Sequence, residues 1–452
     1  MIAAVAGLAR ALFGDGLVGL RLFPSLAMAA TVLLCGETAR TLGGGVYARI
    51  LAQVLAFCAP IFLGMFSILS MNAFDVLIWA ALGGLAARLL AGADPRLWLI
   101  FGVVAGVGLE TKLDVGLLGA GLGLGLLVGG RHTLLRSPWP WAGAGIAAAL
   151  FAPHAIWQVA NGWPTAEFVA NAQRDKMVNF GPVGFLASQL EMVGPVGALY
   201  ALGGLGWLLS AAAARPFRPL GWAIVVVIAV FAASISKPYY LAPAFTILFP
   251  AAGVALEAWT AGRFAAPART AAIAAAALIL VAAPLAKPLL SEDRYVRYAA
   301  ALGVAPSTDE HHALGRLPQF FADMHGWRAL AETVAQVHAA LPPDDRAKAC
   351  VLAGNYGEAG AIDWFGPALG LPPALSGHNS YWTWGPRGCT GEVLVIVGAD
   401  REDLADRFAA IERGAVFRCP DCMPYEDGLE IWVARGLVVP MVEAWPAIRR
   451  FE

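Results

Sequence analysis

Residues 236–243, with the sequence SKPYYLAP, have types and spacing that could bind a charged ligand beside a membrane. They lie between two long apolar runs, Leu220–Ile235 and Leu241–Leu256. Proline breaks the helical hydrogen-bond ladder, and tyrosines concentrate where a membrane meets water. We therefore predict a tight turn at one membrane face, although a turn that only anchors two helices would have the same composition. The groups it presents are Lys237, Tyr239 and Tyr240.

Further polar side chains occur at or near the ends of other apolar runs. Ionisable groups within membrane spans are costly and mark functional sites by default. Groups of mixed sign fit a polar cavity in which Lys112 or Lys237 holds an anionic headgroup. Internal ion pairs, Glu110 with Lys112 or Asp75 with Lys237, are the competing explanation. The candidates are Asn72, Asp75, Glu110, Lys112, Asp114, His154, Trp157, Gln158, Asn161, Glu191 and Lys237.

The composition indicates a polytopic membrane protein that carries a soluble tail. The 452 residues are 59% hydrophobic and 14% charged, whereas soluble domains are roughly 25% charged. The apolar runs end near residue 290, so we expect a membrane domain over 1–290 and a soluble domain over 291–452. The net charge of -1 argues against nucleic-acid binding. Ten helices are predicted: 17–39, 47–68, 73–92, 97–110, 113–130, 139–158, 183–211, 219–236, 239–259 and 270–288.

Arginine and lysine are distributed unequally between the two ends of these helices, and this asymmetry predicts sidedness. One set of helix ends carries ten arginines and lysines, and we predict that it is cytoplasmic. The other set carries five, and we predict that it faces outward together with the soluble tail. The first helix would then start outside, so we expect a preceding helix and its outward loop upstream of Met1. The richer set is Arg40, Arg49, Arg88, Arg96, Arg131, Arg136, Arg215, Arg218, Arg263 and Arg269; the poorer set is Lys112, Arg174, Lys176, Lys237 and Lys287.

Two connecting segments have simpler interpretations than ligand binding. The glycines spaced along 116–125 lie inside an apolar span with no strand before them, so they favour close helix packing over a nucleotide loop. Loop 159–182 is polar and aromatic, and we predict that it forms an interfacial helix along the outer membrane surface.

The tail reads as a small layered α/β domain, because strands and helices alternate. We predict a helix over Gly326–Leu341, with further elements as follows: strands Ala349–Leu352, Val393–Val397 and Glu430–Ala434, and a helix Leu404–Ile411. The turn at Gly354–Ala361 could bind an anion at a helix N-terminus. An outward domain permits disulfides, and we predict a bridge from Cys389 to Cys419 or Cys422. We predict no metal site, because no histidine pair supplements these thiols.

Several motifs in the same order resemble bacterial membrane glycosyltransferases of the protein-mannosyltransferase and aminoarabinose-transferase type, often called GT-C. The resemblance covers nearly the whole chain. The motifs are LSMNAFD (69–75), GLETK (108–112), WQ with NGWPT (157–158 and 161–165) and KPYYLAP (237–243), with three tail segments, Gly354–Ala361, Gly377–Gly385 and Cys422–Glu426.

This resemblance implies transfer of a sugar from a polyprenyl-phosphate donor to a lipid, glycan or protein acceptor at the periplasmic face of the bacterial inner membrane. It requires no cofactor, although a divalent cation is compatible with it. The family's catalytic acid sits in a first outward loop, which we expect upstream of Met1, so no catalytic residue is named. The alternatives are an inactive truncated homologue that acts as a binding or scaffold protein, and a flippase for lipid-linked sugars.

Overall fold

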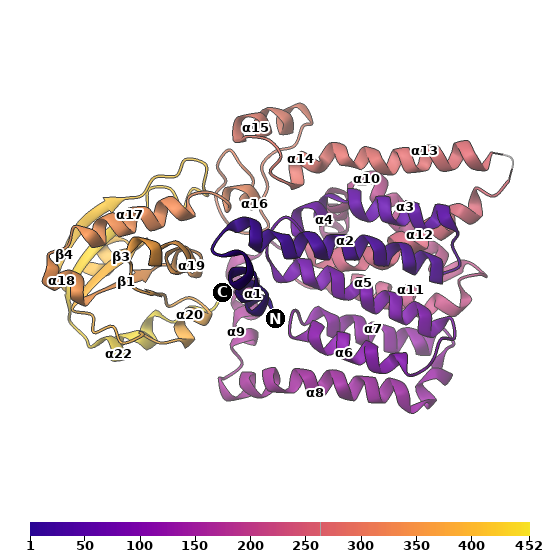
Figure 1. The fold of residues 1–452 in the computed structure, drawn as a ribbon, viewed down its shortest axis with the longest axis horizontal. Coiled ribbons are helices and arrows are strands. Elements are labelled where there is room, and N and C mark those ends of the chain that lie inside the picture. Colours follow the sequence, from indigo (N-terminus) through magenta and orange to yellow (C-terminus); the bar gives the residue numbers. More distant parts are fainter. Residues whose placement is uncertain (263) are drawn as a thin grey trace. The chain divides into compact units, whose positions relative to one another are not determined.

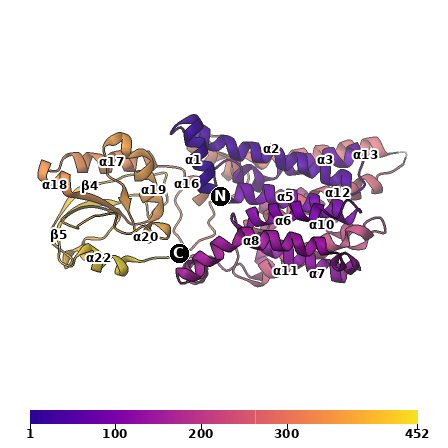
Figure 2. The same ribbon diagram turned by 60° about the horizontal axis from the view of Figure 1, so that its bottom comes forward.

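A computed structural model describes residues 1–262 and 264–452, which form two compact units. Unit 1 comprises residues 1–162 and 179–289, and unit 2 comprises 163–178 and 290–452. Figures 1 and 2 show the helical unit 1 and the mixed unit 2, which are described separately below. Arg263, one of the arginines used to predict sidedness, lies outside the described residues.

Unit 1 is a bundle of apolar helices. Seven stretches of the described chain are long and apolar enough to cross a membrane, and each coincides with a predicted span. The other three predicted spans form shorter apolar helices, α3, α6 and α7. The α-helices of unit 1 are α1 (Ile2–Phe13), α2 (Leu17–Thr41), α3 (Val46–Cys58), α4 (Pro60–Met65), α5 (Met71–Leu90), α6 (Leu97–Leu109), α7 (Asp114–Val128), α8 (Pro138–Ala160), α10 (Gly181–Ser210), α11 (Arg218–Ala233), α12 (Phe245–Trp259), α13 (Ala265–Ala277) and α14 (Ala283–Ala286), with 3₁₀ turns η1 (His132–Arg136), η3 (Arg215–Phe217), η4 (Pro238–Ala244) and η5 (Leu278–Ala282).

Small residues let these helices approach closely, as the glycine run predicts. A Cβ on Gly125 of α7 would lie 2.2 Å from the carbonyl oxygen of Pro219 in α11. A Cβ on Gly121 would lie 3.0 Å from the carbonyl oxygen of Ala223 in α11. Gly119 and Gly123 have no such neighbour within 4 Å, so only one face of α7 needs glycine. The run is therefore a packing surface rather than a nucleotide loop.

Arginines gather at one end of the bundle and tie helix ends together. The Arg131 side chain donates to the carbonyl of Leu90 (2.9 Å), and Arg269 donates to the carbonyl of Glu257 (3.0 Å). Arg49 pairs with Glu37 at 2.7 Å. The opposite ends of the helices carry Lys112 and the η4 turn, so the charge segregation expected from the sequence is present in the fold. Which end faces the cytoplasm stays a prediction.

Unit 2 is built on a five-stranded sheet in the order β2-β1-β3-β5-β4. The strands β1, β2 and β3 are parallel, and β5 joins β3 and β4 in antiparallel pairs. One face packs on α17 and α19, and the other packs on Leu404, Met441 and Trp445. The elements are α9 (Pro164–Asn171), the π turn η2 (Ala172–Lys176), α15 (Glu292–Ala301), α16 (Gln319–Ala322), α17 (Trp327–Ala339), α18 (Pro343–Lys348), β1 (Ala349–Ala353), α19 (Tyr356–Phe365), η6 (Pro367–Leu369), β2 (Ala374–Leu375), α20 (Ser380–Thr383), β3 (Val393–Val397), α21 (Arg401–Ala405), β4 (Phe408–Val416), β5 (Glu430–Leu437), α22 (Met441–Ala444) and η7 (Trp445–Ile448).

The predicted helix over Leu404–Ile411 is wrong. A short helix, α21, ends at Ala405, and β4 begins at Phe408. Strand β4 pairs with β5 through Phe408 opposite Leu437 and Ala410 opposite Arg435. The spacing of the apolar residues in this segment is compatible with a helix or a strand. The segment forms a strand because β5 lies beside it as a hydrogen-bonding partner.

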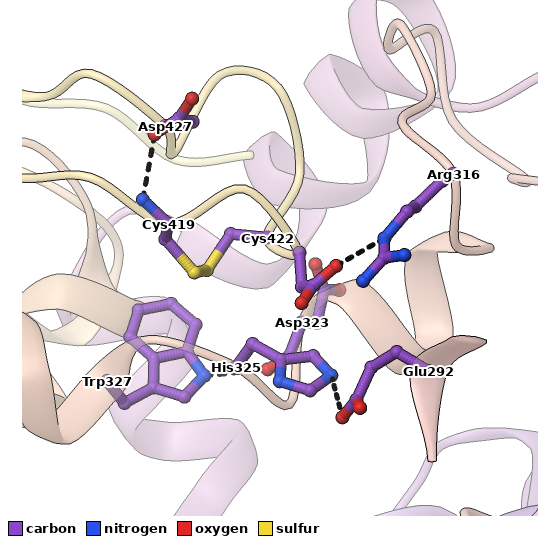
Figure 3. The surroundings of a disulfide bond; sticks show 9 residues. Glu292, Arg316, Asp323, His325, Trp327, Cys419, Cys422 and Asp427 are labelled. Atoms are coloured by element: carbon purple, nitrogen blue, oxygen red, sulfur yellow. Dashed lines mark hydrogen bonds and ion pairs between the residues drawn. A yellow bond between two sulfur atoms is a disulfide. The ribbon is translucent and has the colours of Figure 1, made fainter. Parts of the chain in front are cut away.

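The predicted pairing of Cys389 with Cys419 or Cys422 is also wrong. Cys350 on β1 bonds to Cys389, whereas Cys419 bonds to Cys422 three residues later. The first bridge forms because β1 lies beside β3, and Cys389 lies in the loop that leads into β3. The second forms inside a turn, in which the Cys422 N–H donates to the Cys419 carbonyl at 3.1 Å. Figure 3 shows His325 and Trp327 beside this second bridge.

The loop between α8 and α10 contributes its middle part to unit 2. It contains a helix, α9, as predicted, but this helix binds the end of the chain. The Asn171 side chain donates to the Phe451 carbonyl (2.7 Å), and Arg449 donates to the Glu167 carboxylate (3.0 Å). Farther along the same loop, the Val178 N–H donates to the Asp309 carbonyl at 3.0 Å.

The turn at the start of α19, where the sequence raised the possibility of an anion site, satisfies its N–H donors within the chain. Asn355 accepts hydrogen bonds from the N–H groups of Gly357 (2.8 Å) and Glu358 (3.0 Å). The Glu358 carboxylate accepts from the Gly354 N–H at 2.8 Å and from the Asn355 side chain at 2.8 Å. The chain's own carboxylate therefore satisfies the donors that an anion would need.

Candidate functional site

Lys112 is the centre of a buried ionic group at the end of the bundle opposite the arginines. Its ammonium lies 3.4 Å from Asp75 Oδ2 and 3.1 Å from Asp114 Oδ2. The side chain of Lys112 is 16% exposed, and those of Asp75 and Asp114 are 1% and 7% exposed. The short turn between α6 and α7 carries Lys112, and Asp114 begins α7, where a carboxylate is favoured by the helix dipole. The sequence suggested Glu110 as the partner of Lys112 and Lys237 as the partner of Asp75. The structure instead pairs Lys112 with Asp75 and Asp114.

The same ammonium lies against both tyrosines of the η4 turn. Lys112 Nζ is 4.8 Å from the centre of the Tyr240 ring and 5.6 Å from that of Tyr239. The two rings meet edge to face, with their centres 4.9 Å apart. A cation over the face of an aromatic ring is attracted by its quadrupole. Lys112 therefore joins α5, α7 and η4 through charge and through ring contact.

Gln189 on α10 also contacts the η4 turn. Its amide donates to the Pro238 carbonyl at 3.1 Å and to the Phe185 carbonyl at 3.0 Å. Tyr240 also packs on Phe231 of α11, with ring centres 5.9 Å apart. The turn predicted from its prolines is thus a 3₁₀ segment, and its tyrosines have fixed positions.

The ionic group contains two carboxyl groups and one ammonium. Asp75 and Asp114 face one ammonium; Asp114 Oδ2 pairs with it, whereas Asp75 Oδ1 and Asp114 Oδ1 accept no hydrogen bond from any described residue. The Asn72 side-chain oxygen in the same first turn of α5 is also buried without a hydrogen bond. Buried polar atoms without partners are costly and unusual. An arriving group that donates hydrogen bonds would be stabilised here.

The predicted residues at the end of α8 form a separate cluster. His154 Nε2 lies 3.2 Å from Gln158 Nε2, and the His154 ring stacks on Phe151 with centres 5.2 Å apart. The Asn161 side chain donates to the Trp157 carbonyl at 2.8 Å, which caps the helix end. Trp157 is 44% exposed. Local contacts therefore account for much of this cluster.

Of the other predicted residues, Glu110 is exposed at the end of α6, and Lys237 is half-buried immediately before η4. The structure thus brings Asp75, Lys112, Tyr239 and Tyr240 together, whereas His154, Trp157, Gln158 and Asn161 contact one another. Asp114, also a candidate from the sequence, joins the first group through Lys112. Gln189, which holds the η4 turn, was not predicted, because it had no local signal in the sequence.

No group of three or more histidine, cysteine, aspartate or glutamate side chains in residues 1–262 and 264–452 is arranged to hold a metal ion. The use of a divalent cation therefore stays a prediction.

The chain is a polytopic membrane protein with a GT-C-like fold, and comparisons with known proteins support this class. Residues 1–157 match the sequence profile of the family described as dolichyl-phosphate-mannose-protein mannosyltransferase. No curated protein sequence matches the chain.

Among solved structures, the chain is similar to ArnT from Cupriavidus metallidurans bound to undecaprenyl phosphate, with a TM-score of 0.61 and 16% identity over 96% of this chain and 87% of ArnT. The apo state of the same protein gives a TM-score of 0.61 and 15% identity over 96% of this chain and 86% of that one. At this identity the likeness establishes the fold. The resemblance to membrane glycosyltransferases predicted from sequence is confirmed, by the profile over residues 1–157 and by the fold over nearly the whole chain.

Proposed function

We propose that this chain is a glycosyltransferase that moves a sugar from a polyprenyl-phosphate donor to a lipid, glycan or protein acceptor. The observation that carries the proposal is the buried ionic group of Lys112, Asp75 and Asp114 against two tyrosines at one end of a bundle with this fold. The family profile over residues 1–157 and the undecaprenyl phosphate in the similar ArnT structure support the choice of donor.

The two lysines of this end differ in their positions relative to the η4 turn. Lys112 is engaged by Asp75 and Asp114 and lies against the rings of Tyr239 and Tyr240. Lys237 stands at the start of the turn that Lys112 and Gln189 hold in place. In our proposal Lys237 therefore contacts the donor phosphate directly, and Lys112 positions Tyr239 and Tyr240 beside it.

The sugar transfer requires no further side chain of the η4 turn. The acceptor hydroxyl attacks the anomeric carbon and loses its proton to a general base. The bond between that carbon and the phosphate oxygen breaks, and the polyprenyl phosphate leaves with the electron pair. Cations beside the phosphate stabilise the charge that develops on it. We further propose that this end faces the periplasm of a bacterial inner membrane, with unit 2 on the same side, because the other end is richer in arginine.

Binding of undecaprenyl phosphate to the purified protein in nanodiscs tests the assignment. We expect Lys237→Ala to weaken binding by about tenfold or more, the loss of one charge-assisted contact. Lys287→Ala, an exposed lysine at another helix end, is the matched control and should bind normally. Unchanged affinity of Lys237→Ala would remove Lys237 from the site, and absence of binding by the wild-type protein would overturn the proposed donor.

A further inference from the structure

The helix α9 turns its charge toward the protein and leaves apolar residues exposed. Its sequence is PTAEFVAN, in which Glu167 is the only charged residue. The Glu167 carboxylate accepts a hydrogen bond from Arg449 at 3.0 Å, so the end of the chain engages this charge. On the other side of the helix, Ala166, Val169 and Ala170 are exposed. This is the reverse of a surface helix in water, whose exposed side is polar.

Trp163 extends this apolar side at the start of the helix. It precedes Ala166 by three positions, and Ala166 precedes Val169 by three, so the side chains form one stripe. Trp163 is 52% exposed and Val169 is 44% exposed. The backbone of Trp163 is left-handed (φ 59°), which is uncommon for residues other than glycine. Tryptophan is enriched where a membrane meets water. Trp163, Ala166, Val169 and Ala170 together form the apolar face of α9.

Short connections hold α9 close to the membrane. The preceding helix α8 has 23 residues, which at about 1.5 Å per residue is enough to cross a hydrocarbon core of roughly 30 Å. Residues 161–163 join its end to the start of α9, and three residues span at most about 11 Å. Residues 177–180 join η2 to α10, another candidate span, and four residues span at most about 14 Å. Both ends of the segment therefore stay within reach of the lipid headgroups.

The size of the apolar face favours lipid over a protein partner. The helix has eight residues and is about 12 Å long, whereas a stable protein interface buries roughly 800 Å² on each partner. A lipid surface sets no such minimum area. The exposed ion pair of Arg174 with Asp175 follows in η2 and marks the polar limit of the face.

We propose that α9 lies in the membrane–water interface with its apolar face against the lipid, and that Arg449 holds it in this orientation through Glu167. The partner is a bilayer surface, which binds an amphipathic helix through its apolar side. The sequence predicts an interfacial helix in this loop. The structure adds which face meets the lipid and that the last residues of the chain bind the opposite face. The proposal does not depend on the transferase function.

Fluorescence quenching of the full-length protein, in nanodiscs of phosphatidylethanolamine and phosphatidylglycerol, tests this orientation. Val169→Cys is labelled with a thiol-reactive NBD dye, since the native cysteines are buried or in disulfides. We expect lipids with a spin label near the headgroup to quench the dye, and iodide in the buffer to have little effect. The control is Arg328→Cys on α17, whose side chain is 76% exposed and lies far along the chain from the last candidate span, Ala265–Ala286. Iodide should quench the control label, and spin-labelled lipid should not.

A charge exchange tests the role of the tail. Arg449→Glu repels Glu167 and should shift the Val169 label from lipid quenching toward iodide quenching. Adding Glu167→Arg restores an ion pair of opposite polarity and should restore lipid quenching, which a general failure to fold would not permit. Unchanged lipid quenching in Arg449→Glu would overturn the role of the tail.

Two results with the Val169 label alone would overturn the membrane contact. Quenching by iodide would show that the apolar face meets water. Protection from both quenchers would show that a protein partner or a second copy of the chain covers it. Neither result involves undecaprenyl phosphate, so failure of the proposed donor chemistry would appear only in the binding experiment described above.

Discussion

Lys112 is a buried cation whose contacts reach three parts of the bundle. Its ammonium is shared by Asp75 and Asp114, and it faces the rings of Tyr239 and Tyr240. A buried ion pair contributes little net stability compared with apolar packing, but removing one partner leaves an uncompensated charge. The group is better explained by the arrangement it imposes on η4 than by the stability it adds.

Replacing Lys112 should therefore destabilise the bundle strongly. We expect Lys112→Met to lower the free energy of unfolding by about 3–5 kcal/mol, because two buried carboxylates lose their cation. The apparent melting temperature in detergent reports this loss. Adding Asp114→Asn to Lys112→Met removes one of the stranded charges and should restore part of it. A melting temperature equal to that of wild type would show that the carboxylates have another cation.

Two buried carboxyl groups in unit 2, those of Glu358 and Glu426, should make the stability of this unit depend on pH. Burial raises the pKa of Glu358 and of Glu426 from an ordinary 4.5 to about 7. The folded state therefore binds more protons than the unfolded state between these values, so stability falls as pH rises through 7 and is greatest below about 4.5. Each group contributes about 3 kcal/mol to this fall.

Hydrogen exchange of β5 amides in the full-length protein, corrected for intrinsic rates, measures the effect. Protection should decrease from pH 5 to pH 8 in wild type and decrease less in Glu426→Gln, which cannot ionise. Equal slopes in the two proteins would mean that Glu426 does not titrate in this range.

At the scale of elements, the packing of the bundle depends on glycines at which two helix backbones approach closely. Gly125 lies at the α7–α11 contact, where a Cβ would be 2.2 Å from a backbone oxygen, whereas Gly123 on the same helix faces open space. Because backbone cannot move aside as a side chain can, even one methyl group must separate the two helices.

Gly125→Ala should therefore lower stability by about 1–3 kcal/mol, the usual cost of overpacking. Gly123→Ala is the matched control, and it should be neutral or slightly stabilising because alanine favours helix. Thermal unfolding in detergent compares the two. If both variants melt together, the close approach of α7 and α11 does not limit stability.

At the scale of the whole molecule, the two ends of the bundle differ in charge. Arg131 and Arg269 donate to helix-end carbonyls at one end, and the Lys112 group lies at the other. This asymmetry is the basis for placing the proposed donor site outside the cytoplasm. It concerns the bundle alone and follows from the rule that cytoplasmic loops are richer in arginine and lysine.

Cysteine labelling tests that placement. Glu110 and Arg136 are exposed at opposite ends, and the native cysteines are either buried or in disulfides. In intact spheroplasts a membrane-impermeant maleimide should label Glu110→Cys, whereas Arg136→Cys should react only after lysis. The reverse pattern would place the Lys112 group inside the cell and exclude transfer at the outer face.

Hydropathy was sufficient to find the long apolar helices of unit 1, because a membrane span must bury about 20 residues of backbone in lipid and shows this locally. It did not predict α1, and it merged α3 and α4 into one span. The strands β1 and β3 were also predicted from local sequence, because a short apolar run between turns is typical of a buried strand. The window around Leu404–Ile411 lacked such a signal. Its conformation depended on pairing with β5, which lies farther along the chain.

Residue types and local order by themselves determined that this is a membrane protein with an α/β tail, that its charged groups are segregated, and that it resembles lipid-phosphate glycosyltransferases. Only the tertiary structure decided which partners those residues have: Asp114 for Lys112, Gln189 for the Pro238 carbonyl, and Cys350 for Cys389. The physical reason is range, because hydrophobicity and turn chemistry act between neighbours, whereas ion pairs, disulfides and cavities form between residues that only the packed chain brings together.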